Sequence, residues 1–324
     1  MAEKEWAIPP AAQPDPHLLA FDLDQALASI LAVRSEVPAD AFTASILGTE
    51  RAGSGVLIDR RGLVLTIGYL VTEAETIWLT TAAGGAVPGH AMAYDQASGF
   101  GLVQALSRVD LPPIELGSAV DVEAGDRVIL AGHGGRSAAL DAEVAGKREF
   151  AGYWEYLLNE AIFTTPAHPN WGGAACLDQR GRLIGVGSLL IQHEKNGEEQ
   201  ANGNMVVPID LLPPILDDLT RFGQVSQPPR PWLGMYTADT QSQPVVVGLA
   251  EPGPAAEAGI RVGDVVLEVD DVAVDDLAGM LRRVWSLGEA GVEVPLKVLR
   301  EGQVVHIRVH SADRGSFLKR PMLH

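Results

Sequence analysis

The sequence predicts a mostly β protein with two domains, an all-β pair of barrels followed by a smaller unit that mixes helices and strands. Short apolar runs recur along most of the chain, and turns that contain glycine separate them, which is typical of antiparallel barrels. Residues 223–230 are polar and bear prolines, as linkers do. The 324 residues suffice for two domains of ordinary size.

Composition excludes several classes of function. The formal net charge is -18, which argues against nucleic acid and anionic membranes as partners, because both are bound by Lys and Arg side chains that neutralise phosphates. The single cysteine, Cys176, permits no intrachain disulfide, and no cluster of cysteines or histidines has the spacing of metal ligands. We therefore expect neither a metal nor another cofactor.

The sequence also predicts a location. Its first residues are acidic and polar and lack the apolar core of a secretory signal. No run approaches the roughly 20 apolar residues that span a bilayer. We expect a cytoplasmic protein without a membrane partner.

Residues 1–27 are expected to form an N-terminal arm and a short helix. Four prolines predict an extended, poorly ordered arm over residues 1–16. Leucines at helical spacing then indicate a helix within 17–32 that runs into a strand near 30–33. This helix either docks on the barrels or contributes a subunit contact.

A series of short motifs covers residues 28–222. They lie at residues 53–59, 62–71, 93–103, 116–118, 125–132, 164–178 and 204–210. Taken in this order, they resemble the motifs of the HtrA/DegP-type serine proteases. The resemblance implies a trypsin-like double β-barrel for residues 28–222, and it brings with it the family's Ser-His-Asp triad as an expected active site.

The triad positions of that family hold other residues here. The general-base histidine corresponds to Tyr69, the orienting aspartate to Gly99 and the serine to Gly172, or to Trp171 if the Gly-Gly pairs are aligned instead. Asn170 stands where the family has its oxyanion-hole glycine. None of these positions offers a nucleophilic hydroxyl next to a base.

Serine-protease chemistry needs a hydroxyl, a base that takes its proton and an acid that holds the base. A phenol titrates near ~10 and is a poor base at neutral pH, so Tyr69 does not replace histidine. Asn170 tolerates a left-handed backbone, so an oxyanion-like pocket bordered by Trp171 is one possibility. The favoured alternative is that Trp171 fills the space of the triad. His168 is expected to be an exposed loop residue and Cys176 a buried, inert thiol.

Residues 231–311 follow the linker and are identified by their glycine, proline and alanine spacing as similar to the PDZ domain of HtrA proteins. A PDZ domain adds an extended peptide to a sheet edge and holds its terminal carboxylate in a turn of backbone amides. The resemblance places that turn at Trp232, Leu233, Gly234 and Met235, with a helix over 275–285 beside it. The groove is either open or blocked by the tail, residues 312–324, or by the first domain. The tail itself is expected to be loose.

These observations together predict a non-catalytic pseudoprotease that acts as a peptide- or protein-binding scaffold, adaptor or chaperone. The expected partners are proteins or peptides with hydrophobic C-termini, and the resemblance implies a homo-oligomer, a trimer, or a place in a larger complex. The alternatives are an active endopeptidase that uses residues outside the family pattern and a structural subunit.

Overall fold

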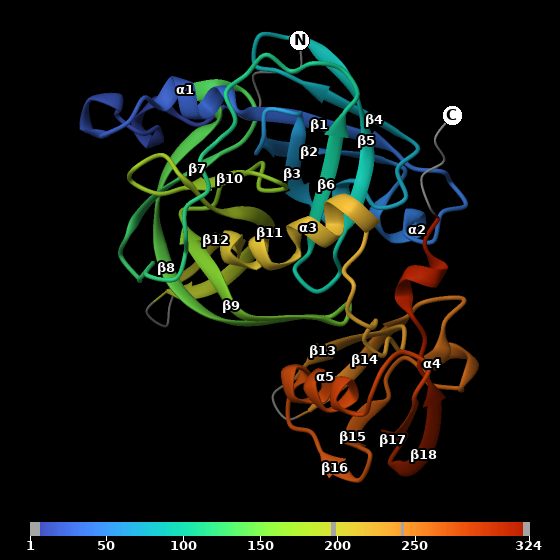
Figure 1. Ribbon diagram of the computed structural model, residues 1–324. Coiled ribbons are helices and arrows are strands. Elements are labelled where there is room, and N and C mark those ends of the chain that lie inside the picture. The colour runs from blue at the N-terminus through green and yellow to red at the C-terminus, as the bar shows by residue number, and fades with distance from the viewer. Residues whose placement is uncertain (1–6, 196–198, 241–242, 320–324) are drawn as a thin grey trace. The chain divides into compact units, whose positions relative to one another are not determined.

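The computed structural model describes residues 7–195, 199–240 and 243–319, which form two compact units (Figure 1). The first unit contains the chain up to Arg148, Glu160–Val225 and Lys319. The second contains Glu149–Asn159 and Ser226–Leu318. The segment 149–159, which the sequence motifs place inside the first domain, is thus grouped with the second unit.

Six strands of the first unit close into a barrel in the order β1-β2-β3-β6-β5-β4. The strands are β1 (Ile30–Glu36), β2 (Glu50–Leu57), β3 (Leu63–Ile67), β4 (Thr76–Thr80), β5 (Ala86–Tyr94) and β6 (Phe100–Ala105). Along β1, Val33 and Ser35 are buried while Arg34 and Glu36 lie nearer the surface, the period of two that a barrel wall requires. All five residues of β3 are buried, because β3 also contacts the second barrel.

A second set of six strands closes in the order β10-β11-β12-β9-β8-β7. The strands are β7 (Arg127–Ala131), β8 (Ala139–Gly152), β9 (Tyr156–Thr165), β10 (Ala175–Leu177), β11 (Leu183–Lys195) and β12 (Glu199–Pro208). The predicted pair of barrels is confirmed. Helix α3 (Pro213–Phe222) follows the second barrel and contacts β5 of the first.

The N-terminal segment is more ordered than the sequence predicted. Ile8 is only 4% exposed and belongs to the core of the second barrel, and its amide donates to the carbonyl of Ser137 at 2.8 Å. Short 3-10 turns, η1 (Pro10–Ala12) and η2 (Pro16–Leu18), lead to α1 (Leu23–Ala28). The apolar side chain of Ile8 therefore anchors a segment whose prolines indicated a loose arm. Residues 1–6 of that predicted arm lie outside the described residues.

The remaining elements of the first unit are short. They are α2 (Ala44–Leu47), η3 (Gly68–Leu70), η4 (Gly135–Ala138) and η5 (Ile209–Leu211).

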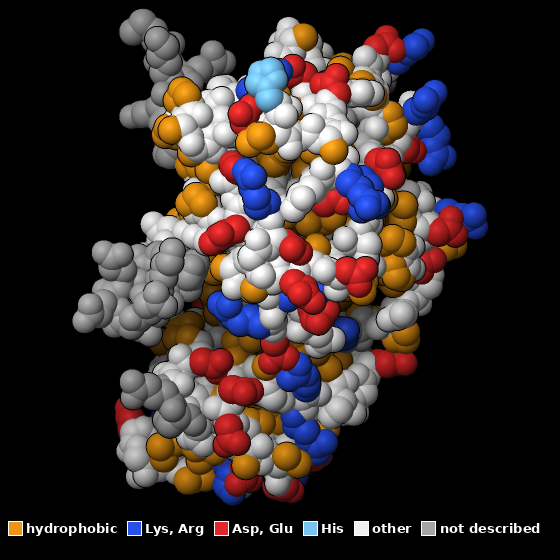
Figure 2. Space-filling view, turned by 90° about the vertical axis from the view of Figure 1, so that its left-hand side faces the viewer, with side chains coloured by type: hydrophobic (Ala, Val, Ile, Leu, Met, Phe, Trp, Pro, Cys, Tyr) orange, Lys and Arg blue, Asp and Glu red, His pale blue; other side chains and the backbone are white. Residues whose placement is uncertain are grey.

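Acidic and basic side chains are interspersed on the face of the molecule seen in Figure 2. Within the described residues, no helix has the length and apolar character needed to cross a membrane.

In its described residues, the second unit is a sheet with two α-helices and a 3-10 turn. Its elements are β13 (Met235–Asp239), β14 (Pro244–Leu249), α4 (Pro254–Glu257), β15 (Val265–Val269), β16 (Val272–Ala273), α5 (Leu277–Ser286), β17 (Glu293–Arg300), β18 (Gln303–His310) and η6 (Arg314–Phe317). The main path of the sheet runs β13-β14-β15-β17-β18, so β13 lies at an edge. Helix α5 begins after Asp276, which caps it by accepting from the Gly279 amide at 2.6 Å, and it confirms the helix expected over 275–285.

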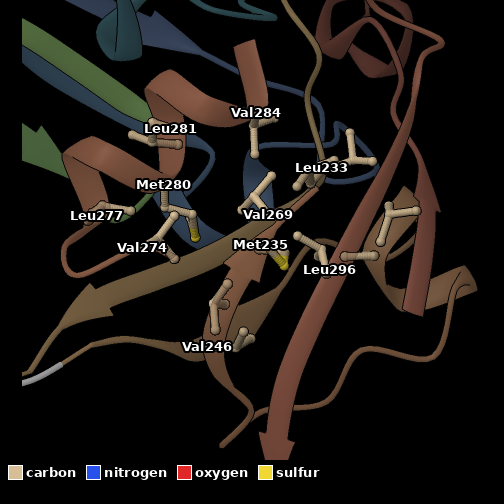
Figure 3. Packing of buried hydrophobic residues seen from close by; sticks show 14 of the residues in the cluster. Leu233, Met235, Val246, Val269, Val274, Leu277, Met280, Leu281, Val284 and Leu296 are labelled. Atoms are coloured by element: carbon tan, nitrogen blue, oxygen red, sulfur yellow. The ribbon is translucent and has the colours of Figure 1, made fainter. Parts of the chain in front are cut away.

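Helix α5 covers the core of this unit. Leu277, Met280, Leu281 and Val284 of α5 pack in one cluster with Leu233, Met235, Val246, Val269 and Leu296 of the sheet and its preceding turn (Figure 3). The tail is ordered through Lys319, contrary to the sequence prediction. The rings of Phe317 and Trp232 lie 5.0 Å apart, and the Lys319 amide donates to a carboxylate oxygen of Glu73 at 2.9 Å. Residues 320–324 lie outside the described residues.

Candidate functional site: the Tyr69–Gly172 junction and the amide turn at 233–235

Tyr69 and Gly172 lie against each other where the two barrels meet. Tyr69 belongs to η3, directly after β3 of the first barrel, and Gly172 lies in the loop between β9 and β10 of the second. A Cβ atom on Gly172 would lie 2.9 Å from the Tyr69 hydroxyl. The phenol therefore occupies the space in which a side chain at position 172 would begin.

A bulge in the second barrel fixes the position of this hydroxyl. The ladder between β11 and β12 shifts register between Gly187 and Leu189, so Ser188 has no partner there. The Tyr69 hydroxyl donates to the Ser188 carbonyl oxygen at 3.0 Å. Burial raises the pKa of Tyr69 above its ordinary value, although a hydrogen bond from the Trp171 side chain lowers it. Tyr69 thus keeps its proton at neutral pH and cannot act as a base.

Trp171 was expected to fill the space of the missing triad. In the structure Tyr69 fills the part next to Gly172, and Trp171 is a partly buried hydrogen-bond partner of the phenol. Gly99 supplies only backbone here, since its carbonyl oxygen accepts from the Gly68 amide at 2.7 Å, one residue before Tyr69. The structure therefore brings the three positions that correspond to the triad into one region. Gly99 contributes a backbone carbonyl there, Tyr69 a phenol and Gly172 no side chain.

The loop that carries Gly172 is held tightly against β2. The Ser54 amide donates to the Gly172 carbonyl oxygen at 2.8 Å. Gly173 has φ +76°, and a Cβ atom there would lie 1.8 Å from the Ser54 carbonyl oxygen. Only glycine fits such a close approach of two backbones.

His168 is buried, in contrast to the exposed loop residue that the sequence predicted. Its side chain is 0% exposed, its amide donates to the Asn204 side-chain oxygen at 2.6 Å, and its Nδ1 accepts from the Asn170 amide at 3.0 Å. Because Nδ1 accepts, Nε2 carries the proton and donates to the Ala138 carbonyl oxygen, 3.0 Å away. Burial lowers the pKa of His168, which keeps the ring neutral. No local motif indicates this burial, because Ala138 and Asn204 lie far from His168 along the chain.

Asn170 does not have the left-handed backbone that the sequence analysis considered. Its amide, which stands where the resemblance places an oxyanion-hole donor, is used by His168. This amide is therefore not directed at a substrate oxygen, and the oxyanion-like pocket lacks one of its expected donors.

The other nucleophilic candidate at this end of the molecule is inaccessible. Cys176 is 0% exposed in β10, and burial raises its thiol pKa to about 12, with a smaller contribution from the charge of Asp178. The burial that the sequence predicted for Cys176 is confirmed. Among the residues that the structure describes, no group of three or more His, Cys, Asp or Glu side chains is placed to hold a metal ion.

The second region of interest is the turn before β13, where three backbone amides converge on one carboxylate. The Leu233 amide lies 3.0 Å from Oε2 of Glu155, and the Gly234 and Met235 amides lie 2.6 Å and 3.0 Å from Oε1. Gly234 has φ +74°, which turns these amides toward one point. Leu233 and Met235 are buried. Trp232 does not join them, since its amide donates to the Ala312 carbonyl oxygen at 3.0 Å.

No sequence motif indicates that Glu155 binds this turn. It is separated by 78 residues from Leu233, whose amide it accepts, and a single acidic residue among aromatic ones predicts no partner. It is 6% exposed. Burial raises the pKa of the Glu155 carboxyl to about 7, while the three amides and the charge of Arg314 act in the opposite direction.

Comparison with known proteins agrees with both parts of this architecture. Residues 53–186 match the trypsin-like peptidase domain, and residues 231–310 match the PDZ domain. The chain is 28% identical over 299 residues to protease Do-like 1, chloroplastic, of Arabidopsis thaliana, across 83% of this chain and 65% of that protein. It is 25% identical over 275 residues to the serine endoprotease DegS of Escherichia coli (strain K12), across 79% of this chain and 75% of DegS.

The chain spans less than two thirds of the length of two relatives. It covers 65% of the Arabidopsis protein and 56% of a probable periplasmic serine endoprotease, DegP-like, of Halomonas elongata. Among solved structures, the HtrA-type protease AlgW with a decapeptide shares the fold, with a TM-score of 0.53 and 20% identity over 93% of this chain and 98% of AlgW. The two domain matches occur in the same order as the two units of the fold, and the relatives agree on the same type of protein. The chain belongs to the HtrA-like family, whose members join a trypsin-like peptidase domain to a PDZ domain.

Proposed function

We propose that this protein is a non-catalytic member of the HtrA-like family, a pseudoprotease that binds peptides or proteins through its PDZ unit as a scaffold, adaptor or chaperone. One observation carries the proposal. The Tyr69 hydroxyl lies 2.9 Å from the point where a side chain would begin on Gly172. At the positions that the family uses for its base and its nucleophile, a protonated phenol faces a residue that has no side chain.

The chemistry of acyl transfer supports this proposal. Attack on a peptide carbonyl needs a nucleophile, a base and donors for the developing oxyanion. Gly172 offers no hydroxyl, and the pKa of Tyr69 is raised. The Asn170 amide is bound to His168. The nucleophile and the base are thus missing at one place, and one expected oxyanion donor is occupied there.

Two of the relatives named above, DegS and the DegP-like protein of Halomonas elongata, are serine endoproteases by name, so an active enzyme with other residues is the alternative. The hydroxyls near Gly172 that could serve it, paired with His168, are Thr164 and Thr165, and Cys176 is the one thiol. Thr164 and Cys176 are 0% exposed, so neither can reach a substrate without unfolding of β9 or β10. Thr165 is only partly buried, but both ring nitrogens of His168 are bonded to backbone groups and do not serve it as a base. The burial of two candidates and the missing base for the third disfavour the alternative.

The peptide-binding part of the proposal rests on the turn at 233–235. Three amides that converge on a carboxylate form the kind of site that holds the C-terminus of a peptide. The buried side chains of Leu233 and Met235 beside it suit a partner with a hydrophobic C-terminus. We further propose a homo-oligomer, a trimer by analogy with the family, or a place in a larger complex. The cytoplasmic location stays a prediction.

Labelling with a fluorophosphonate probe tests the catalytic part, together with turnover of unfolded casein. The wild-type protein is expected to show neither. Gly172→Ser is the informative companion, because it restores the hydroxyl but leaves Tyr69 in place, and it is also expected to stay unlabelled. Stoichiometric labelling of the wild-type protein, or casein turnover that co-elutes with it and disappears in Cys176→Ala or Thr164→Val, would refute the proposal.

A further inference from the structure

We propose that residues 149–159 are a built-in ligand of the PDZ unit, with the Glu155 carboxylate in the place of a peptide's C-terminal carboxylate, so that a free peptide binds only when this segment leaves. The inference rests on the proposed peptide-binding function and adds a regulatory step to it. Glu155 lies in the turn that joins β8 to β9, and this turn is part of the second unit.

The carboxylate contacts are those expected for a peptide C-terminus. Oε1 of Glu155 accepts from the amides of Gly234 and Met235 at 2.6 Å and 3.0 Å, and Oε2 accepts from Leu233 at 3.0 Å. These side-chain oxygens stand in for the two oxygens of a terminal carboxylate. Each of these amides has one hydrogen, so a peptide carboxylate cannot bind them while Glu155 is present.

The backbone near Glu155 also uses the edge where a peptide would add as a strand. In the sheet path β13 has a neighbour, β14, on one side only. On its other side the Thr237 amide donates to the Tyr153 carbonyl oxygen at 2.9 Å. The rings of Tyr153 and Tyr236 lie 6.0 Å apart, edge to face. The segment thus makes a main-chain bond of the type by which PDZ domains bind extended peptides.

An apolar side chain and a charge pair complete the contact. Leu157, 9% exposed, joins the core cluster that contains Leu233 and Met235. Glu149 forms an ion pair with Arg282 of α5. Carboxylate, strand edge and apolar contact are the features by which a PDZ domain recognises a ligand, and one segment of the chain supplies all of them.

The segment is held in a form from which it can be released. Glu155 has φ +60°, a left-handed backbone that residues other than glycine seldom adopt. Such a conformation persists only where contacts impose it, here the bonds to the turn at 233–235. A peptide that takes over those amides removes the contacts that hold Glu155 in place.

The expected consequence is competition within one chain. The affinity of a free peptide is reduced by the fraction of molecules in which the segment has left. A tethered ligand acts at an effective concentration of order millimolar, so we expect the reduction to be about tenfold or more. Removal of the Glu155 carboxylate should restore this affinity.

The test uses the full chain and a fluorescent peptide that ends in leucine with a free carboxylate, followed by anisotropy. Glu155→Ala is expected to bind it at least about tenfold more tightly than the wild type. Glu160→Ala, which removes a carboxylate that is 70% exposed near the same turn, should bind like the wild type. The same peptide with an amidated C-terminus should lose binding to Glu155→Ala.

Hydrogen exchange on the wild-type protein gives a second measurement that needs no substitution. Saturating peptide should speed exchange across 149–159 while the amides of 233–235 stay protected. Equal affinity of wild type and Glu155→Ala, or unchanged exchange across 149–159 with peptide bound, would overturn the built-in ligand and leave peptide binding intact. If neither protein binds the peptide at millimolar concentration, both the built-in ligand and the proposed peptide-binding function are overturned. Casein turnover bears only on the catalytic part of the proposed function.

Discussion

The contact between Tyr69 and Gly172 can be tested by a double-mutant cycle. Gly172→Ala places a Cβ atom 2.9 Å from the Tyr69 hydroxyl, closer than the two atoms can remain. The phenol must move, and its hydrogen bond to the Ser188 carbonyl oxygen is lost or weakened. Tyr69→Phe removes the hydroxyl first, so that the same alanine meets no such atom.

The magnitude follows from the groups involved. Leaving the buried Ser188 carbonyl without its donor costs about 1–3 kcal/mol. Alanine stabilises by about 0.4–1 kcal/mol relative to glycine, because it reduces the entropy of the unfolded chain and Gly172 does not have a left-handed φ. Gly172→Ala should therefore destabilise the wild type by about 0.5–2 kcal/mol and stabilise Tyr69→Phe by about 0.4–1 kcal/mol. The expected coupling energy, the difference between these two effects, is about 1–3 kcal/mol.

Urea unfolding of the wild type, both single variants and the double variant, followed by circular dichroism, measures the four free energies. The transition of the first unit is the one to compare, because both residues belong to it. An equal cost of Gly172→Ala in both backgrounds, within about 0.5 kcal/mol, would refute the reasoning. It would mean that the phenol does not occupy the space beside residue 172, and the main argument for a non-catalytic site would fall with it.

Two further predictions concern the loop around residue 172. Burial lowers the pKa of His168 below its unfolded value near 6.5, so its contribution to stability should be complete above pH 6.5 and lost as the pH falls through the lower folded pKa. His168→Gln should flatten this part of a curve of unfolding free energy against pH. An unchanged slope would contradict the assignment. Gly173→Ala should destabilise the protein by more than about 3 kcal/mol, because its Cβ atom would lie 1.8 Å from the Ser54 carbonyl oxygen. Gly84→Ala is the control: it has φ +85° with no atom within 4 Å and should cost about 1 kcal/mol. Thermal unfolding that ranks the two variants the other way would exclude the close approach.

Local patterns predicted the fold well. Strands such as β3 and β17 are continuous or alternating apolar runs, and glycines mark the turns between them. Helix α5 carries a capping aspartate, Asp276, and an apolar face. These signals lie within a few residues of one another, so a single sequence contains all of the information needed to find them.

The details of both sites depend on partners that are distant along the chain. Tyr69 could be identified as a departure from the family pattern. The acceptor of its hydroxyl, the Ser188 carbonyl oxygen, is left outside the β11–β12 ladder by a bulge that no local motif predicts. His168 stands between prolines and was expected to be exposed; it is buried because Ala138 and Asn204 bind it. Glu155 was missed for the same reason. A side chain's partner across the fold is a property of the tertiary structure.

The two sites differ in what can replace the residue that fills them. At the barrel junction the filling group is the Tyr69 phenol, which is fixed by the backbone of η3 and by a hydrogen bond to a buried carbonyl. This group is part of the chain, and its acceptor is a backbone carbonyl oxygen of the same unit. At the turn before β13 the filling group is the Glu155 carboxylate, and any peptide C-terminus carries the same chemical group. Exchange there replaces one carboxylate by another and leaves the three amides satisfied throughout. A functional response of this chain to a partner is therefore expected at the turn before β13, and a ligand that altered the surroundings of Tyr69 without displacing Glu155 would show this expectation to be wrong.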